Sequence, residues 1–246
     1  MTYCVGILVH EGLAMIADTR TNAGVDNIAT FRKLHLFEEA GERVMALATA
    51  GNLAVAQSVL SIANEGLENP GTGASERLLD MDSMFKAAQF VGRAIRAVHR
   101  VDGEPLERSQ NGGFDVSMLL GGQVKGGRLR LFQIYAAGNF IEATDDTPYL
   151  QIGEHKYGKP ILDRSVTERL DLREALKLGL ISMDSTIRSN IGVGLPIDIV
   201  TIRRDAVRAE LRYRIDANEP YFQNLRERWS EALRAAHSDI PPPPYT

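Results

Sequence analysis

The sequence predicts an α+β fold in four layers, an αββα sandwich in which helices cover the outer faces of two packed sheets. Three observations lead to this fold class. Strand-like segments occur in groups joined by short turns, helix-like segments occur in pairs between those groups, and several strands are apolar along their whole length. Such strands are expected to be covered on both faces, and two stacked sheets with outer helices satisfy this better than a parallel doubly wound sheet.

The chain begins with a predicted β-hairpin. Two apolar runs, residues 4–9 and 13–17, are joined by a turn at residues 10–12, and the second run ends at Asp18. Chain termini are usually polar and poorly ordered. An apolar pattern that starts immediately after Thr2 therefore predicts that the first residues are tied into the fold.

Two more strands are predicted after this hairpin. Residues 31–37 alternate, so one predicted face carries Lys33 together with three ring side chains, those of Phe31, His35 and Phe37. Residues 43–50 form a continuous apolar strand that Gly51 ends.

Helical apolar spacing then covers residues 53–67 and 79–101, which predicts a pair of helices. Residues 102–113 are polar and contain glycine, and we predict a mobile loop there.

The remaining elements repeat this order. The sequence predicts strands at residues 115–120, 129–137 and 149–152, a turn region at 121–127, helices at 160–164 and 173–188, and a hairpin of 197–202 with 209–215. A C-terminal helix is predicted at about residues 218–237, and residues 238–246 form a proline-rich tail that favours an extended conformation. No internal repeat or domain boundary is visible, so residues 1–246 are interpreted as a single domain.

The composition argues against several classes of protein. The formal net charge is −4 and the cationic residues are scattered, so no nucleic-acid partner is expected. The single cysteine, Cys4, cannot form a disulfide within the chain, and the 5 histidines show no metal-ligand spacing, so no metal or other cofactor is predicted. Neither a secretory signal nor an apolar run of about 20 residues is visible, so we expect no membrane association and predict the cytoplasm as the location.

Thr2 is the first candidate for chemistry. Methionine before a residue as small as threonine is normally removed after synthesis, which leaves the Thr2 hydroxyl on the same residue as a free α-amine. That amine has an ordinary pKa of about 7.7–8.0, so a fair fraction is neutral at physiological pH. An adjacent N-terminal amine is a recognised activator of a threonine nucleophile. The alternative is that Met-Thr is a common start with no chemical meaning.

Asp18 and Lys33 are predicted to form a pair beneath this hydroxyl. Burial lowers the pKa of a lysine, whereas a neighbouring carboxylate restores its charged form. Such a pair holds a cation beside the hydroxyl and eases its deprotonation. The alternatives are a solvated turn around Asp18 and a strand-edge charge at Lys33.

Gly51 is the fourth candidate. It stands between an apolar strand and a predicted helix, where the lack of a side chain lets a substrate approach. Its backbone N–H, near a helix N-terminus, is suited to stabilising an oxyanion. The alternative is a plain strand-to-helix turn.

The spacing of these four residues matches a known catalytic motif. It resembles that of the proteasome β-subunit family, the threonine proteases among the N-terminal-nucleophile hydrolases. The resemblance implies their αββα fold and hydrolysis of peptide or related amide bonds. It also implies a nucleophilic Thr2, an Asp18–Lys33 pair beneath it and an oxyanion donor at Gly51.

Two later segments depart from the β-subunit pattern. Residues 152–155 replace the family's Gly-Ser-Gly, and residues 185–190 replace its Asp followed by Ser-Gly-Gly, with Ser189 as the candidate for the serine position. Three segments, residues 2–6, 152–160 and 182–186, are instead similar to a bacterial branch of the family, the Anbu (ancestral beta subunit) proteins.

This resemblance implies a homo-oligomer, either a ring or an open helical stack, and a peptide or small amide substrate. It leaves any ATPase partner open. An alternative function is a self-assembling shell or scaffold with weak or vestigial activity, which the altered residues at Glu154 and 185–190 favour. A further alternative is Cys4 as the nucleophile, although an isolated strand cysteine is more often buried and inert.

Overall fold

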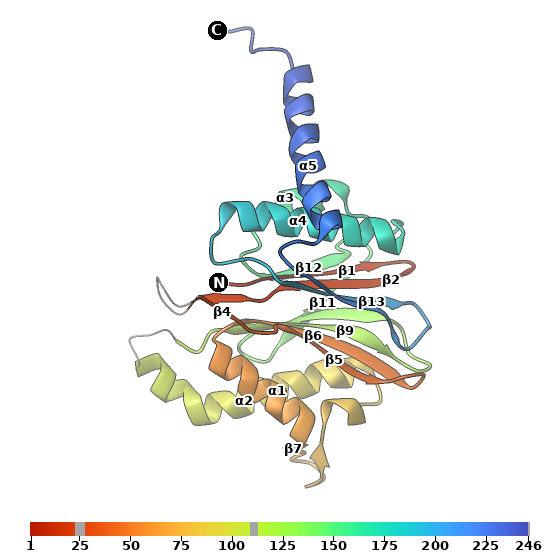
Figure 1. The fold of residues 1–246 in the computed structure, drawn as a ribbon. Helices are drawn as coiled ribbons and strands as arrows, with labels where there is room; N and C mark the ends of the chain where they lie inside the picture. Colours follow the sequence, from red (N-terminus) through yellow and green to blue (C-terminus); the bar gives the residue numbers. More distant parts are fainter. Residues whose placement is uncertain (23–27, 109–112, 246) are drawn as a thin grey trace.

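The computed structural model describes residues 1–22, 28–108 and 113–245, which form four layers (Figure 1). Two five-stranded sheets are stacked, and helices cover the outer face of each. The αββα prediction is therefore confirmed.

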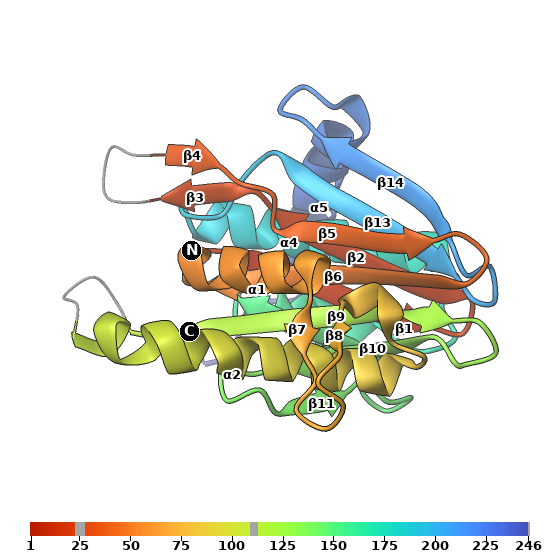
Figure 2. The same ribbon diagram turned by 90° about the horizontal axis from the view of Figure 1, so that it is seen from below.

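The strands are antiparallel to their neighbours in both sheets. The first sheet has the order β12-β1-β2-β13-β14, formed by Tyr149–Gly153, Tyr3–Val9, Gly12–Asp18, Ile197–Arg203 and Ala209–Ile215. The second has the order β11-β10-β9-β6-β5, formed by Phe140–Glu142, Arg130–Ile134, Val116–Val124, Arg43–Gly51 and Leu34–Glu39. Two short hairpins lie outside these sheets, namely β3 (Arg20–Asn22) with β4 (Ile28–Thr30) and β7 (Leu67–Glu68) with β8 (Ser75–Glu76) (Figure 2).

The helices occur in pairs, as the sequence predicts. The second sheet is covered by α1 (Leu53–Glu65) and α2 (Met84–Arg108), and the first by α3 (Lys159–Ser165) and α4 (Leu172–Ser189) (Figure 1). Asn52 starts α1 by capping, because its Oδ1 accepts the N–H groups of Ala54 and Val55. A single 3₁₀ turn, η1 (Leu78–Asp80), precedes α2. None of the helices in the described ranges is both long and apolar enough to cross a lipid bilayer.

The predicted N-terminal hairpin is confirmed, and its strands are buried on both faces. β1 and β2 pair with Cys4 opposite Ala17. Successive side chains of a strand point to opposite faces. Val5 and Ile7 accordingly pack in the cluster beneath α4, whereas Cys4 lies in the cluster between the two sheets. The start of the chain is thus part of the core.

The C-terminal helix α5 (Pro220–Asp239) stands away from the sandwich and carries the C-terminus with it (Figure 1). Phe222 and Leu225 in its first turns are buried, and most of its later side chains are exposed. Arg226 Nε donates to Oδ1 of the buried Asp184 of α4 at 2.6 Å. This ion pair fixes the base of α5 on α4.

We expect Arg226→Met to lower the free energy of unfolding by about 1–3 kcal/mol, because it removes a charge-assisted hydrogen bond from a buried carboxylate. Among the described residues, Asp184 would then keep only Arg188, at 3.5 Å, as an ion-pair partner. Arg228→Met, at an exposed position of the same helix, is the matched control, with an expected change within about 0.5 kcal/mol. Denaturant unfolding measures both, and equal losses would contradict the assignment.

One predicted loop is wrong in part. Residues 102–108 continue α2, and residues 109–112 lie outside the described residues. Leu106 packs against the cluster between the helices and the second sheet, and the chain at Gly103 lies close to the His99 ring. This packing outweighs the cost of Pro105 inside a helix.

Two strand boundaries also differ from prediction. β9 continues through Gly121, where the sequence predicts a turn. A Cβ on Gly121 would lie 2.5 Å from the Leu13 side chain. Glycine is therefore needed here for the close approach of the two sheets and not for a turn. β5 begins at Leu34, so Lys33 precedes the strand and Phe31 is exposed. The common strand face predicted for Phe31 and Lys33 is therefore not formed.

Candidate active site

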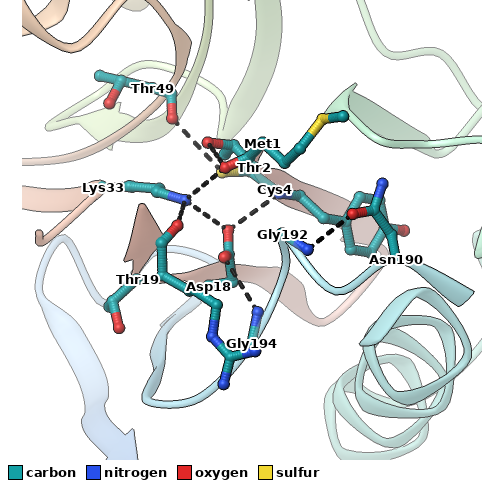
Figure 3. Close-up of polar contacts among 12 residues, drawn as sticks. Met1, Thr2, Cys4, Asp18, Thr19, Lys33, Thr49, Asn190, Gly192 and Gly194 are labelled. Carbon is teal, nitrogen blue, oxygen red and sulfur yellow. Dashed lines mark hydrogen bonds and ion pairs between the residues drawn. The ribbon is translucent and has the colours of Figure 1, made fainter. Parts of the chain in front are cut away.

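Asp18 lies in the interior at the end of β2 (Figure 3). Its Oδ1 accepts the N–H of Tyr3 at 3.0 Å, and its Oδ2 accepts the N–H of Gly194 at 3.3 Å. Burial raises the pKa of the Asp18 carboxyl above its ordinary value, while the charge of Lys33 and the Tyr3 N–H oppose that rise. Both carboxylate oxygens are therefore held by fixed donors.

Lys33 brings a cation to this carboxylate. Its Nζ lies 2.9 Å from Asp18 Oδ1, and its side chain is 5% exposed, so the ammonium is turned away from bulk solvent. The same Nζ donates to the carbonyl of Arg20 at 2.6 Å and to that of Met1 at 3.2 Å. A lysine ammonium has three donors, so each has a partner here and the charge is fixed in place.

Thr2 lies against the same cluster (Figure 3). It is 7% exposed, and its Oγ1 donates to the Met1 carbonyl at 2.8 Å, the acceptor that Lys33 also uses. The hydroxyl and the ammonium thus converge on the peptide bond that joins Met1 to Thr2. The fold brings Thr2, Asp18 and Lys33 together from the start of β1, the end of β2 and the segment before β5.

Gly51 ends β6 in a backbone conformation with φ +101°, which side chains rarely adopt. A Cβ at this position would lie 2.3 Å from the carbonyl oxygen of Asp115. Gly51 and Gly153 line the same cavity, and Gly153 abuts Thr2, since a Cβ on it would lie 2.0 Å from the Thr2 carbonyl oxygen. The cavity therefore joins the neighbourhood of Thr2 to that of Gly51.

We expect Gly51→Ala to lower the free energy of unfolding by about 2–3 kcal/mol, through a strained φ and a clash with backbone atoms. Gly41→Ala is the matched control, because Gly41 also has a positive φ but a Cβ there would contact nothing within 4 Å. The control should lose only about 1 kcal/mol. Losses of the same size in denaturant unfolding would show that the contact with Asp115 does not matter.

Ser189 is the remaining predicted site residue, and it is not bonded into this cluster. It is the last residue of α4 and is exposed, and within the described ranges no hydrogen bond joins it to Thr2, Asp18 or Lys33.

The segment that follows approaches the site instead. Asn190 Oδ1 accepts the N–H of Gly192 at 2.9 Å, and Gly192 packs against Met1, where a Cβ would lie 2.5 Å from Met1 Cβ. Gly192 and Gly194 are not among the predicted site residues, although alternating glycines directly after a helix are a signal of close backbone approach.

The surroundings of Cys4 do not favour it as the nucleophile. Its Sγ is buried and donates to the Thr49 carbonyl at 3.7 Å, and burial raises the pKa of the thiol above its ordinary value. His155 is exposed, with Nδ1 3.0 Å from the Gly153 carbonyl. Within the part of the chain that the structure describes, no group of three or more His, Cys, Asp or Glu side chains is arranged to hold a metal ion.

Comparison with known proteins places this chain in a family. A model of the proteasome subunit family matches residues 87–202, and no curated protein matches the chain. Anbu from Hyphomicrobium sp. strain MC1 is 50% identical over 98% of both chains, with a TM-score of 0.88. Anbu (ancestral beta-subunit) from Yersinia bercovieri is 46% identical over 97% of both chains, with a TM-score of 0.88. A helical assembly of the Anbu complex from Pseudomonas aeruginosa is 43% identical over 98% of both chains, with a TM-score of 0.89. The chain therefore belongs to the Anbu (ancestral beta-subunit) family of proteasome-like proteins.

Proposed function

We propose that this protein is an N-terminal threonine hydrolase that cleaves peptide or related amide bonds once Met1 has been removed. One observation carries the proposal: Thr2 Oγ1 and Lys33 Nζ reach the same carbonyl oxygen, and the buried Asp18 holds the ammonium there. Membership of a proteasome-like family supports the same chemistry.

The reaction begins at the Thr2 hydroxyl. Without Met1, the Thr2 nitrogen is an amine, and it takes the hydroxyl proton, directly or through a water, as Oγ1 bonds to the amide carbon. Lys33 stabilises the negative charge that develops on Oγ1, and Asp18 orients Lys33. The carbonyl oxygen becomes an oxyanion, for which we propose the Gly51 N–H as donor.

The intermediate then collapses. The Thr2 ammonium gives its proton to the departing nitrogen, the carbon–nitrogen bond breaks, and an ester joins the acyl group to Oγ1. Water attacks this ester with the amine again as base, which releases the acid and restores the hydroxyl. Ser189 lies exposed at the end of α4, and a supporting role for it stays a prediction.

A covalent probe for N-terminal threonine tests the proposal. Intact mass of protein made in bacteria first establishes that Met1 is absent. We expect one probe per chain, mapped to Thr2 by peptide mass spectrometry. Mature protein that takes up no probe would refute the mechanism.

A second candidate is a self-assembling shell with weak or vestigial activity. The exposure of Ser189, which forms no hydrogen bond with Thr2 in the described ranges, favours it. Because the Pseudomonas aeruginosa relative is a helical assembly, we propose that this chain also forms a homo-oligomer, as a closed ring or an open stack. Light scattering and electron microscopy measure the assembly, while the probe separates the two candidates.

A further inference from the structure

A cavity of about 490 Å³ opens beside the proposed oxyanion donor. Residues of β6, β9, β10 and β12 contribute to its walls, and Gly51 and Gly153 are among the residues that line it. Gly153 contacts Thr2, so a substrate whose carbonyl lies between Thr2 and Gly51 would extend into this cavity.

Asp115 supplies a carboxylate to the cavity wall. Its main chain is fixed next to Gly51, because the N–H of Asn52 donates to its carbonyl at 2.7 Å. The residue is exposed and makes no ion pair within the described ranges. Residues 109–112, just before it in the chain, include no Lys or Arg. The carboxylate therefore stands beside the reaction centre without a counter-ion.

Further hydrogen-bonding groups of the cavity are also free. Ser117 and Gln133 line it, and neither side chain forms a hydrogen bond with another residue in the ranges described. A hydroxyl and an amide oxygen both accept hydrogen bonds. Together with Asp115 they form a set of acceptors that suits a group with several N–H donors.

Lys159 also lines the cavity, but its charge is already neutralised. Lys159 Nζ donates to both oxygens of Asp163, at 2.6 and 2.9 Å, and to the Tyr149 hydroxyl at 3.1 Å. All three of its donors are used, so it does not compete for Asp115. The charge left to select a ligand in this cavity is negative.

We propose that this cavity binds a cationic side chain, of the lysine or arginine type, on the substrate next to the amide that is cleaved. The cation donates to the Asp115 carboxylate, and Ser117 and Gln133 accept its remaining N–H groups. The assignment of the cation to a substrate rests on the proposed function, whereas the binding of a cationic side chain does not.

Binding of unreactive peptides tests the cavity by itself. Two acetylated, fluorescent peptides that end in lysinol or norleucinol, and so have no amide after that residue to be cleaved, are titrated against the full mature protein by anisotropy. We expect the lysinol peptide to bind about three- to tenfold more tightly. Asp115→Asn keeps the backbone contact with Asn52 and should abolish this preference. Asp239→Asn, the same change at an exposed site on α5, should preserve it. Equal affinities in the unmodified protein, or a preference that survives Asp115→Asn, would overturn the proposal.

Reactive probes then separate this proposal from the hydrolase itself. The same lysine and norleucine side chains are placed beside the electrophile of an N-terminal threonine probe. Labelling of Thr2 at equal rates by both probes would refute the cavity's role and leave the hydrolase standing. A lysine preference of the unreactive peptides without any labelling of Thr2 would uphold the cavity and refute the hydrolase.

Discussion

Replacing Thr2 with alanine is expected to lower kcat for amide hydrolysis by about 10⁴-fold or more, because the variant keeps an N-terminal amine but has no hydroxyl to attack the substrate. Alanine is small enough for Met1 still to be removed. Loss of the hydroxyl removes the atom that a threonine probe acylates, so labelling by the probe should disappear with the activity. Fluorogenic peptide amides measure the first effect and intact mass the second.

Two controls make this result specific. Thr2→Ser restores a hydroxyl beside the amine, and we expect its rate to lie within about tenfold of that of the unmodified protein. Cys4→Ala should leave labelling intact, because the Cys4 thiol is buried between the sheets. Undiminished activity in Thr2→Ala, or a label that moves to Cys4, would rule out Thr2 as the nucleophile.

The second large effect is expected for Lys33→Met, which should abolish most activity and also destabilise the fold. We expect kcat to fall by about 10³-fold, since the cation beside Oγ1 is lost. The free energy of unfolding should fall by about 3–5 kcal/mol, because the fully buried Asp18 carboxylate is left without its counter-ion.

The double variant Lys33→Met with Asp18→Asn separates the two effects. The neutral amide at residue 18 still offers an oxygen to the Tyr3 N–H, so much of the lost stability should return while activity stays absent. A double variant no more stable than Lys33→Met would show that the carboxylate is not the cause.

The pH dependence gives an independent check of Lys33→Met. Burial already raises the pKa of Asp18, and removal of Lys33 raises it further. A carboxyl whose pKa is higher in the folded state opposes folding at neutral pH, and this cost is lost as the pH falls through the raised pKa toward the ordinary value. The difference in stability between Lys33→Met and the unmodified protein should therefore shrink on acidification, as denaturant unfolding at a series of pH values would show. A difference that grows on acidification would contradict this account.

Local pattern was sufficient for much of the fold. The hairpin of β1 and β2, the hairpin of β13 and β14, and the four covering helices follow from apolar periodicity and from turn residues at short spacing. These signals report burial and chain reversal, which neighbours in the sequence determine.

Packing between distant segments decided the differences. The polar residues at the end of α2 are typical of a loop in the sequence, but in the structure Leu106 packs against an apolar cluster. Gly121 looks like a turn residue until Leu13 of the other sheet is seen to occupy the space that a side chain would need. Neither contact has a local signature, because its two partners lie far apart in the chain.

At the candidate site, residue types and spacing determined which groups are present: a threonine after the initiating methionine, an aspartate at the end of an apolar strand, a lysine and a glycine. The tertiary structure alone decided that Lys33 uses all three of its donors on Asp18, Arg20 and Met1, and that Asn190 rather than Ser189 contacts the loop that packs against Met1. The reason is physical. A sequence pattern specifies which face of a strand or helix is buried, whereas the direction of a hydrogen bond in the interior depends on where several separate segments place their donors and acceptors.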